Sequence, residues 1–381
     1  MRNSIVLSAL VICSACSSSS TGAKSDGGPH PGTDSGASDT TQSFVTDFGT
    51  AVEVGHDAPV IGDSSAQLLI YATTDHELFS FDPTTSQVTL IGPYDTTNTI
   101  TDIAVNKDGL ITINSESTLY DVTLPSTPGG TVVTSNARAI PSYSKSDYST
   151  SVFALAYAPI GTLEATTEAL VYGDGSGNIY YMPSGGGAVQ KLGGFGAIKP
   201  TDPDYDDPTT STASPTNLWQ LSGDIVFIAA GSDTESGEPI GFATIRPQDC
   251  SNTNFGDWDL VCRNDVVVQI NMTNLVQKSA TANLNGGILG KGASVGSLFG
   301  LAAWNAHVYG FERGSGTCTA STLGGANLVD ISLVSGNSLG TATVLNDFAD
   351  DICNASSSDK GWSGAGVTTV VPLVYTPIVV Q

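Results

Sequence analysis

The run at residues 201–207, Thr-Asp-Pro-Asp-Tyr-Asp-Asp, is the stretch best suited to bind a metal ion. Alternating carboxylates on a loop can converge on a hard cation such as calcium, which takes six to eight oxygen ligands. An EF-hand loop also needs a glycine at its sixth position and a glutamate at its twelfth, and this stretch has neither. A solvated acidic loop therefore remains the simpler interpretation. The candidate calcium ligands are Asp202, Asp204, Asp206 and Asp207.

Trp258 is the aromatic residue best suited to contact a ligand. It lies in a polar insertion between Cys250 and Cys262, where strand packing does not require an indole ring. For catalysis, residues 292–296 spell the Gly-x-Ser-x-Gly string of a nucleophile elbow, but that turn needs a preceding strand and a following helix. Here a glycine-rich loop precedes the string and an apolar strand pattern follows it. We therefore assign no catalytic residue.

Four cysteines lie in the body of the chain, and an even number in an exported protein predicts disulfides. Three connectivities are open. We favour Cys250 with Cys262 and Cys318 with Cys353, because each pair brackets a polar insertion between strands. Zinc is the alternative, but no two of these cysteines have the two-residue spacing of common zinc sites.

The first residues of the chain form a short export signal. Arg2 precedes the apolar residues 5–12, a run too short to span a bilayer. The sequence Cys-Ser-Ala-Cys at 13–16 resembles a bacterial lipobox, which implies a diacylglycerol thioether on Cys16 after removal of residues 1–15. In that family a residue other than aspartate after the cysteine, here Ser17, implies transfer to the outer membrane. The alternative is an ordinary secretory signal that leaves a soluble protein.

The segment from 16 to 44 carries the lipidated cysteine and is then composed almost entirely of Ser, Thr, Gly, Asp and Pro. Such a segment has little apolar surface to bury and cannot offset its ordering entropy. We expect a flexible linker that holds a folded domain, residues 45–381, away from the membrane.

The composition of the chain limits both its fold and its partners. A net charge of −24 without any Lys/Arg cluster argues against nucleic-acid binding. The 43 glycines and a charged fraction of 13% leave little material for amphipathic surface helices. We therefore expect an all-β domain that is large enough for a sizeable core.

A unit of four short strands recurs through this domain with a period near fifty residues, a pattern that resembles the blades of a β-propeller. Three complete copies cover residues 100–133, 152–192 and 298–345. A fourth is expected to contain strands at 218–221, 225–228, 266–270 and 275–277, with a long insertion before the third strand. A β-sandwich or a two-domain β protein is the alternative.

The ends of the domain predict how the ring closes. Only three strands of a unit are found in residues 68–91, and the apolar stretch 362–367 can supply the missing inner strand. We count five blades in a single β-propeller closed by its C-terminal strand, or six if residues 44–61 contain further strands. Self-closure removes open strand edges.

Location and fold together suggest a membrane-anchored binding or scaffolding module that contacts a protein or a glycan through its loops. The rival hypothesis is a calcium-assisted propeller hydrolase acting on a lactone, an ester or a glycan. A passive structural coat protein is a third class. The sequence makes no prediction about oligomeric state.

Overall fold

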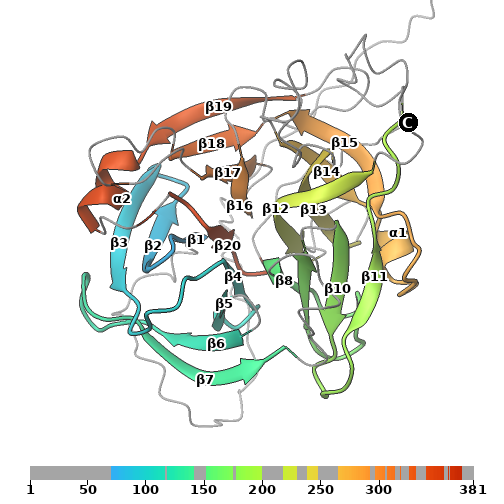
Figure 1. Ribbon diagram of the computed structural model, residues 1–381, viewed down its shortest axis with the longest axis horizontal. Helices are drawn as coiled ribbons and strands as arrows, with labels where there is room; N and C mark the ends of the chain where they lie inside the picture. The colour runs from blue at the N-terminus through green and yellow to red at the C-terminus, as the bar shows by residue number, and fades with distance from the viewer. Residues whose placement is uncertain are drawn as a thin grey trace, which may run out of the picture. The chain divides into compact units, whose positions relative to one another are not determined.

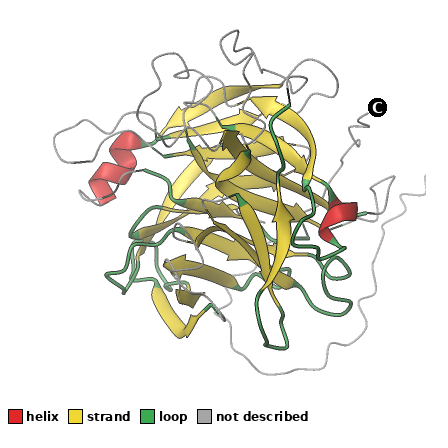
Figure 2. Cartoon of the chain, turned by 45° about the vertical axis from the view of Figure 1, so that its right-hand side comes forward, coloured by secondary structure: helices red, strands yellow, loops and turns green. Residues whose placement is uncertain are grey.

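Strands, paired almost entirely antiparallel, and the loops between them make up most of the part of the chain that the structure describes (Figures 1 and 2). The strands form five four-stranded blades around a common axis, which confirms the predicted all-β propeller. The computed structural model describes residues 70–115, 118–140, 152–174, 177–199, 218–229, 238–247, 265–291, 297–304, 307–313, 318, 326–331, 340–355, 359 and 361–370.

Blades 2 and 3 are simple meanders in which the first strand lies nearest the axis (Figure 1). Blade 2 comprises β4 (Asp102–Val105), β5 (Ile111–Ser115), β6 (Thr118–Thr123) and β7 (Val133–Ala139). Blade 3 comprises β8 (Val152–Ala158), β9 (Ala169–Asp174), β10 (Asn178–Met182) and β11 (Gln190–Gly194).

Blades 4 and 5 have the same internal order, and a short parallel pairing also joins their outermost strands. Blade 4 comprises β12 (Trp219–Ile228), β13 (Ile240–Pro247), β14 (Val266–Ile270) and β15 (Asn285–Lys291). Blade 5 comprises β16 (Leu298–Trp304), β17 (His307–Glu312), β18 (Asn327–Ile331) and β19 (Gly340–Asp347).

Blade 1 combines both ends of the described chain. Its inner strand is β20 (Gly364–Gly366), which pairs antiparallel with β1 (Ile70–Thr73), followed outward by β2 (Glu77–Asp82) and β3 (Gln87–Pro93). Tyr71 faces Gly366 in this register and Thr73 faces Gly364. The predicted closure of the ring by residues 362–367 is therefore confirmed.

The hydrophobic core lies between neighbouring blades. Separate apolar clusters join blades 1 and 2, blades 2 and 3, and blades 3 and 4, while the largest joins blades 4, 5 and 1. Inner strands are buried on both faces, as in β4 and β12, so apolar residues occur at consecutive positions in them and do not simply alternate with polar ones. Complete burial of one Ile or Leu side chain contributes about 1.5–3 kcal/mol.

The predicted strand pattern of blade 4 was wrong in two places. Residues 218–228 form the single strand β12 and not two strands, because Ser222-Gly223-Asp224 is a bulge between Leu221 and Ile225 instead of a turn. The second strand is β13, and residues 275–277 are not a strand. The helix α1 (Met272–Leu275) ends there, and its start is capped by the Asn271 side chain, which accepts a hydrogen bond from Asn274 N.

Two short helices lie at the periphery of the ring (Figures 1 and 2). One is α1, and the other is α2 (Ala349–Ala355), which follows the last strand of blade 5. A disulfide joins Cys353 of α2 to Cys318, which confirms one of the two predicted pairs. This bond fixes α2 to the segment that follows β17.

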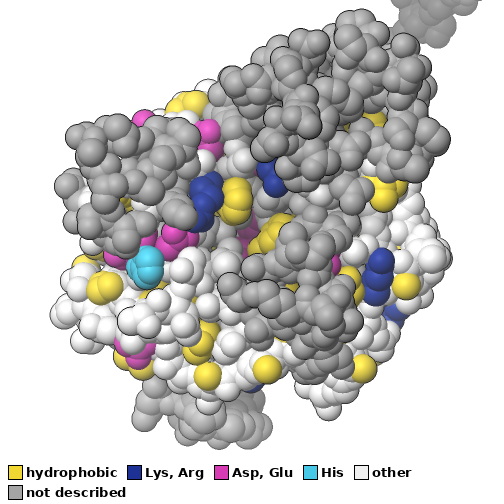
Figure 3. Space-filling model, in the orientation of Figure 1, with side chains coloured by type: hydrophobic (Ala, Val, Ile, Leu, Met, Phe, Trp, Pro, Cys, Tyr) yellow, Lys and Arg dark blue, Asp and Glu magenta, His cyan; other side chains and the backbone are white. Residues whose placement is uncertain are grey.

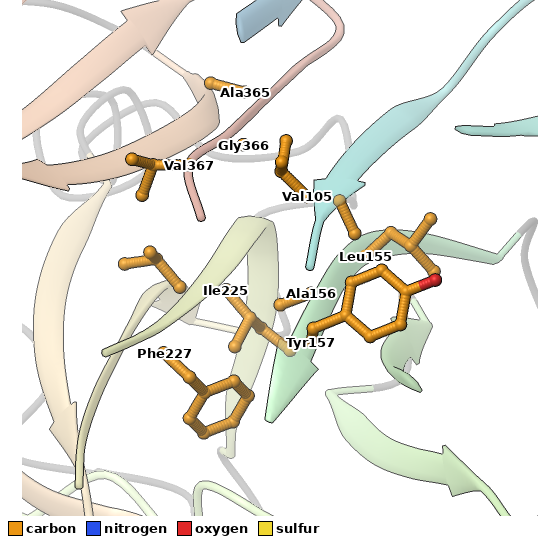
Figure 4. Close-up of a pocket in the computed structure, with 11 residues that line it drawn as sticks. Val105, Leu155, Ala156, Tyr157, Ile225, Phe227, Ala365, Gly366 and Val367 are labelled. Atoms are coloured by element: carbon orange, nitrogen blue, oxygen red, sulfur yellow. The ribbon is translucent and has the colours of Figure 1, made fainter. Parts of the chain in front are cut away.

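The axis of the ring is filled by side chains from four inner strands, as Figure 4 shows. They leave a cavity of about 10 Å³, roughly the space of one water molecule. A ligand therefore has no room on the axis at this depth. The lining residues are Ala104, Val105, Leu155, Ala156, Tyr157, Ile225, Val226, Phe227, Ala365, Gly366 and Val367.

Candidate binding face

One face of the ring carries the chemically useful side chains. In an antiparallel blade the start of the first strand and the end of the second lie at the same edge. The segments before β4, β8 and β16 therefore share a face with the loops after β1 and β17. We call this the binding face. Figure 3 shows basic, acidic and histidine side chains together near the centre of one face of the molecule.

A cavity of about 240 Å³ opens on the binding face. Its walls come from blades 1, 2, 3 and 5, so residues far apart in sequence meet there only when the ring is closed. This volume suits a single sugar ring or one large side chain, and it is smaller than a typical drug-sized pocket. The lining residues are Asp75, Thr99, Ile100, Thr101, Val152, Phe153, Phe299 and Arg313.

Arg313 is the cation of this cavity and is held from three sides. Its guanidinium donates from Nη2 to both carboxylate oxygens of Asp75, at 2.8 and 3.1 Å, and from Nη1 to Ser363 Oγ at 2.7 Å. Its Cζ atom also lies 5.2 Å from the ring centroid of Phe299, within cation–π range. The guanidinium is therefore a rigid part of the wall.

Two partly buried phenylalanines give the cavity its apolar surface. Phe153 lies at the start of β8 and Phe299 at the start of β16. Aromatic faces pack against the C–H face of a sugar or an apolar side chain. Thr99 adds a hydroxyl, and the hydroxyl of Thr101, which donates toward the carbonyls of Asn114 and Val152, can accept a hydrogen bond. The wall can therefore bind an uncharged ligand that has both apolar and polar edges.

Two buried carboxyl groups, Asp102 and Asp224, hydrogen bond to each other deeper in the ring. Burial raises the pKa of each above its usual range, and the charge of Asp224 raises that of Asp102 further. Two carboxylates that are close together and shielded from water repel each other, so a single proton held between them is favoured. Asp102 accepts from Ile103 N (2.7 Å) and Leu155 N (2.5 Å).

Asp224 has a similar set of backbone donors. It accepts from Ile225 N at 2.6 Å and from Leu301 N at 2.7 Å, and the Ala365 N–H also donates to it. Backbone N–H groups thus occupy the oxygens of both carboxyl groups. This donor set stabilises negative charge without a metal ion, which does not suit a central calcium site.

Three further carboxyl groups on or near this face have raised pKa values. Burial raises the pKa of Glu77 to about 8, helped by its hydrogen bond to Asp359, and burial also raises that of Glu312 to about 8. Asp265 accepts from Leu298 N at 2.5 Å and from the Ser222 hydroxyl, and burial raises its pKa to about 6. Glu77 and Glu312 are therefore mostly neutral near pH 7, whereas Asp265 is mostly ionised.

The described histidines pair with aspartates. His76 Nδ1 lies 2.6 Å from Oδ1 of the buried Asp359, just before the closing strand. His307 Nδ1 lies 2.9 Å from Asp330 Oδ2 on neighbouring strands of blade 5. Among the hydrogen bonds of the described residues, neither imidazole ring bonds to a hydroxyl or a thiol; the contact of His76 with the Thr74 hydroxyl is made by its backbone N–H. Both pairs therefore hold strands and loops together.

Most of the site residues predicted from sequence lie outside the described residues. This applies to Cys16, to the pair Cys250 and Cys262, to Trp258 and to the acidic stretch 202–207. Within the described ranges, no group of three or more His, Cys, Asp or Glu side chains could hold a metal ion. These earlier assignments remain predictions.

The sequence did carry a signal for the buried carboxyl pair that we did not use. Asp102 and Asp224 each stand immediately before an apolar run, in Asp-Ile-Ala-Val and Asp-Ile-Val-Phe. A charged residue inside an apolar inner strand is expected to be buried and paired. The cavity residues carry no such signal, because ring closure alone brings them together.

Comparisons with known proteins give little functional guidance. No protein-family model matches the chain, and no curated protein is similar to it. A protein of unknown function from Bacteroides caccae is 11% identical, with 79% of this chain and 98% of the other covered and a TM-score of 0.37. The Dos1 propeller is 10% identical, with 78% of this chain and 67% of the Dos1 chain covered and a TM-score of 0.32. At these scores neither likeness supports a function.

No helix in the described part of the chain has the length and apolarity needed to cross a bilayer.

Proposed function

We propose that this protein is a binding module that uses the cavity of the binding face to contact a glycan or protein ligand. The observation that carries the proposal is the pairing of Phe153 and Phe299 with the fixed Arg313 in one cavity of about 240 Å³. Aromatic anchors in a concave site are the residues that most often dominate binding energy. The β-propeller itself commonly serves as a scaffold for such loops.

Mutation of the cavity tests this proposal. Printed arrays of oligosaccharides and of peptides would be probed with the domain and with the Phe153→Ala and Phe299→Ala variants. We expect each substitution to weaken binding of the selected probe about tenfold, the effect of losing roughly 1.4 kcal/mol. Leu110→Ala is the control, because Leu110 is exposed beside the turn at the opposite face. Equal loss in the control variant would contradict the proposal.

We also propose that the protein acts while anchored to the outer membrane through lipidated Cys16. The lipobox resemblance of residues 13–16 supports the anchor. Two or three acyl chains hold a protein at a membrane far longer than one chain does. Fractionation of cells that express the wild type and Cys16→Ser tests this: the wild type is expected with membranes and the variant in the soluble fraction. Identical partition of the two would refute the anchor.

The rival calcium-assisted hydrolase gains no specific support from the described residues. Its proposed ligands in 202–207 lie outside them, and the axial carboxyl groups accept backbone N–H bonds. Thermal melting with calcium and with a chelator separates the two hypotheses. The binding-module proposal expects equal melting temperatures, whereas a calcium shift lost in Asp204→Asn would favour the hydrolase.

A further inference from the structure

The carboxyl groups of Asp102 and Asp224 meet near the axis of the ring and link inner strands of different blades. We propose that this pair is the positioning device of the binding face, because its hydrogen bonds to Leu155 N and Leu301 N fix the two strand segments that carry Phe153 and Phe299. The role of those phenylalanines in binding rests on the proposed function. The positioning itself rests on the strand geometry.

The first of these segments is the start of β8. Leu155 N donates to Asp102 Oδ2 at 2.5 Å, two residues after Phe153. The pairing of β8 with β9 is irregular between Phe153 and Ala156, and Ala154 has a positive φ of 58°. An alanine is rarely found in this left-handed region. The hydrogen bond to Asp102 thus helps to retain a backbone shape that the segment would not adopt alone.

The second segment is the start of β16. Leu301 N donates to Asp224 Oδ2 at 2.7 Å, and the pairing with β17 is irregular between Leu298 and Gly300, around Phe299. Asp224 therefore anchors the bulge that presents Phe299, as Asp102 anchors the bulge that presents Phe153. Asp224 also accepts the N–H of Ala365 in β20. The pair thus reaches three further strands, β8, β16 and β20, and each aspartate also binds a neighbour in its own strand.

Few other charges surround the pair. Strands β8, β16 and β20 contain one titratable side chain, Tyr157, whose hydroxyl hydrogen bonds to Thr112 Oγ1 at 2.8 Å. Strand β4 contributes only Asp102 and β12 only Asp224. Strand β16 also binds the buried carboxyl group of Asp265 through Leu298 N, and Arg246 of β13 is the cation near Asp265. Loss of the shared proton would leave two carboxylates facing each other, and Asp102 or Asp224 would have to move away from its N–H donors.

Two isosteric substitutions distinguish the roles of the partners. Asp102→Asn keeps a donor toward Asp224 but cannot titrate, whereas Asp224→Asn removes the negative charge that accepts the N–H of Leu301 and Ala365. Asp95→Asn is the matched control, because exposed Asp95 accepts the N–H of Thr134 at the outer edge of blade 2. Hydrogen exchange of segments 152–158 and 298–304 would be followed with pH, after correction for the intrinsic exchange rate.

We expect Asp224→Asn to increase exchange in 298–304 at least tenfold, and Asp95→Asn to affect only the region of Thr134. In the wild type, exchange of both segments should rise as pH increases, and Asp102→Asn should abolish that rise. With ¹³C-labelled aspartate, the Cγ signals of Asp102 and Asp224 should titrate together and well above the usual range near pH 4.

Three results would overturn the proposal. The first is that the Cγ signals of Asp102 and Asp224 titrate independently near pH 4. The second is that Asp224→Asn and Asp95→Asn change hydrogen exchange in 298–304 equally. The third is that hydrogen exchange in Asp102→Asn depends on pH as it does in the wild type. If Asp224→Asn does not fold, the proposal is still tested by the pH profile of hydrogen exchange in Asp102→Asn and by the Cγ titration of the wild type. None of these measurements uses a ligand, so failure of the proposed function would leave them unchanged.

Discussion

Blade 1 and blade 3 have the same four-stranded sheet but are assembled differently. Blade 3 is continuous in sequence from Val152 to Gly194, and its inner strand pairs with β9 along most of its length. Blade 1 joins residues 70–93 to β20, which has only three residues. A short strand from the far end of the chain has few backbone hydrogen bonds to hold it.

Side chains from blade 5 and from the closing segment compensate for this short pairing. Trp362 is fully buried, and its ring makes edge contacts with Phe79 (5.2 Å) and Phe311 (5.5 Å). Ser363 and Arg313 bind Asp75 in the loop after β1. Ring closure therefore depends on specific side-chain contacts at the junction of blades 1 and 5, whereas blade 3 is held by local hairpins.

Truncation of Trp362 should have the largest effect. Trp362→Ala removes a fully buried ring and is expected to cost about 3–5 kcal/mol of unfolding free energy, measured by denaturant titration. Phe195→Ala in the core of blade 3 should cost a similar amount, because Phe195 is also buried. The two variants should differ in hydrogen exchange, because only Trp362→Ala should increase the exchange of the backbone amides in residues 70–73 and 364–366. Equal exposure in both variants would contradict a special role of the junction.

Loss of the disulfide should come next. The bond between Cys318 and Cys353 closes a loop with a sequence separation of 35, for which chain entropy gives roughly 4 kcal/mol. We expect Cys318→Ser with Cys353→Ser to lower the unfolding free energy by about 2–4 kcal/mol and to free α2. Peptide mapping without reductant should show this pair and also tests the predicted pair Cys250 and Cys262. A crossed pairing would refute both assignments.

Removal of Arg313 should have an intermediate effect. Arg313→Ala leaves the buried carboxylate of Asp75 without its cation, and we expect a loss of about 2–3 kcal/mol in thermal or chemical unfolding. The control is Arg138→Ala, which breaks the more exposed pair with Asp121 and should cost about 0.2–1 kcal/mol. If both variants lose the same unfolding free energy, the pair of Arg313 and Asp75 stabilises the protein no more than an exposed ion pair does.

The effect of pH should be smaller and has a definite sign. The pKa of Glu77 is about 8 in the folded protein and 4.5 for the free side chain, so its contribution is fully present below pH 4.5. It is lost as pH rises to 8, because the unfolded chain releases the proton first. Glu312 acts in the same sense. We expect a higher urea midpoint at pH 5 than at pH 8.

Glu77→Gln should reduce that difference between pH 5 and pH 8. The control is exposed Glu164, whose pKa is lowered by its hydrogen bonds to Ser184 and Thr167. Its contribution is present at high pH and lost on acidification, so Glu164→Gln should increase the difference slightly. A larger difference in Glu77→Gln than in the wild type would show that Glu77 is ionised in the folded state.

The number of blades and the closing strand could be predicted from sequence because both depend on local patterns. Alternating apolar residues and turn signals such as Asn106 to Gly109 recur in each unit, and Gly109 has the positive φ that this turn requires. The disulfide Cys318–Cys353 was predicted in the same way, from cysteines that bracket an insertion.

Blade 4 could not be predicted correctly because a long-range contact overrides its local signal. Ser222-Gly223-Asp224 has the composition of a turn. A Cβ atom on Gly223 would lie 1.6 Å from Leu298 O of the next blade, so glycine is needed for close strand approach and not for a turn. The cavity was missed for the same reason, since Phe153 and Phe299 meet only across the closed ring.

The central claim is that the binding face, and not the opposite face, contacts the ligand. A photo-crosslinking side chain at exposed Thr99 beside the cavity can be compared with one at Asp108 in the turn after β4, on the opposite face. In cells that carry the full-length chain, we predict a covalent adduct from position 99 and none from position 108. The assignment of the ligand to the binding face would be contradicted by adducts from position 108 alone, by equal adducts from both positions, or by no adduct from either.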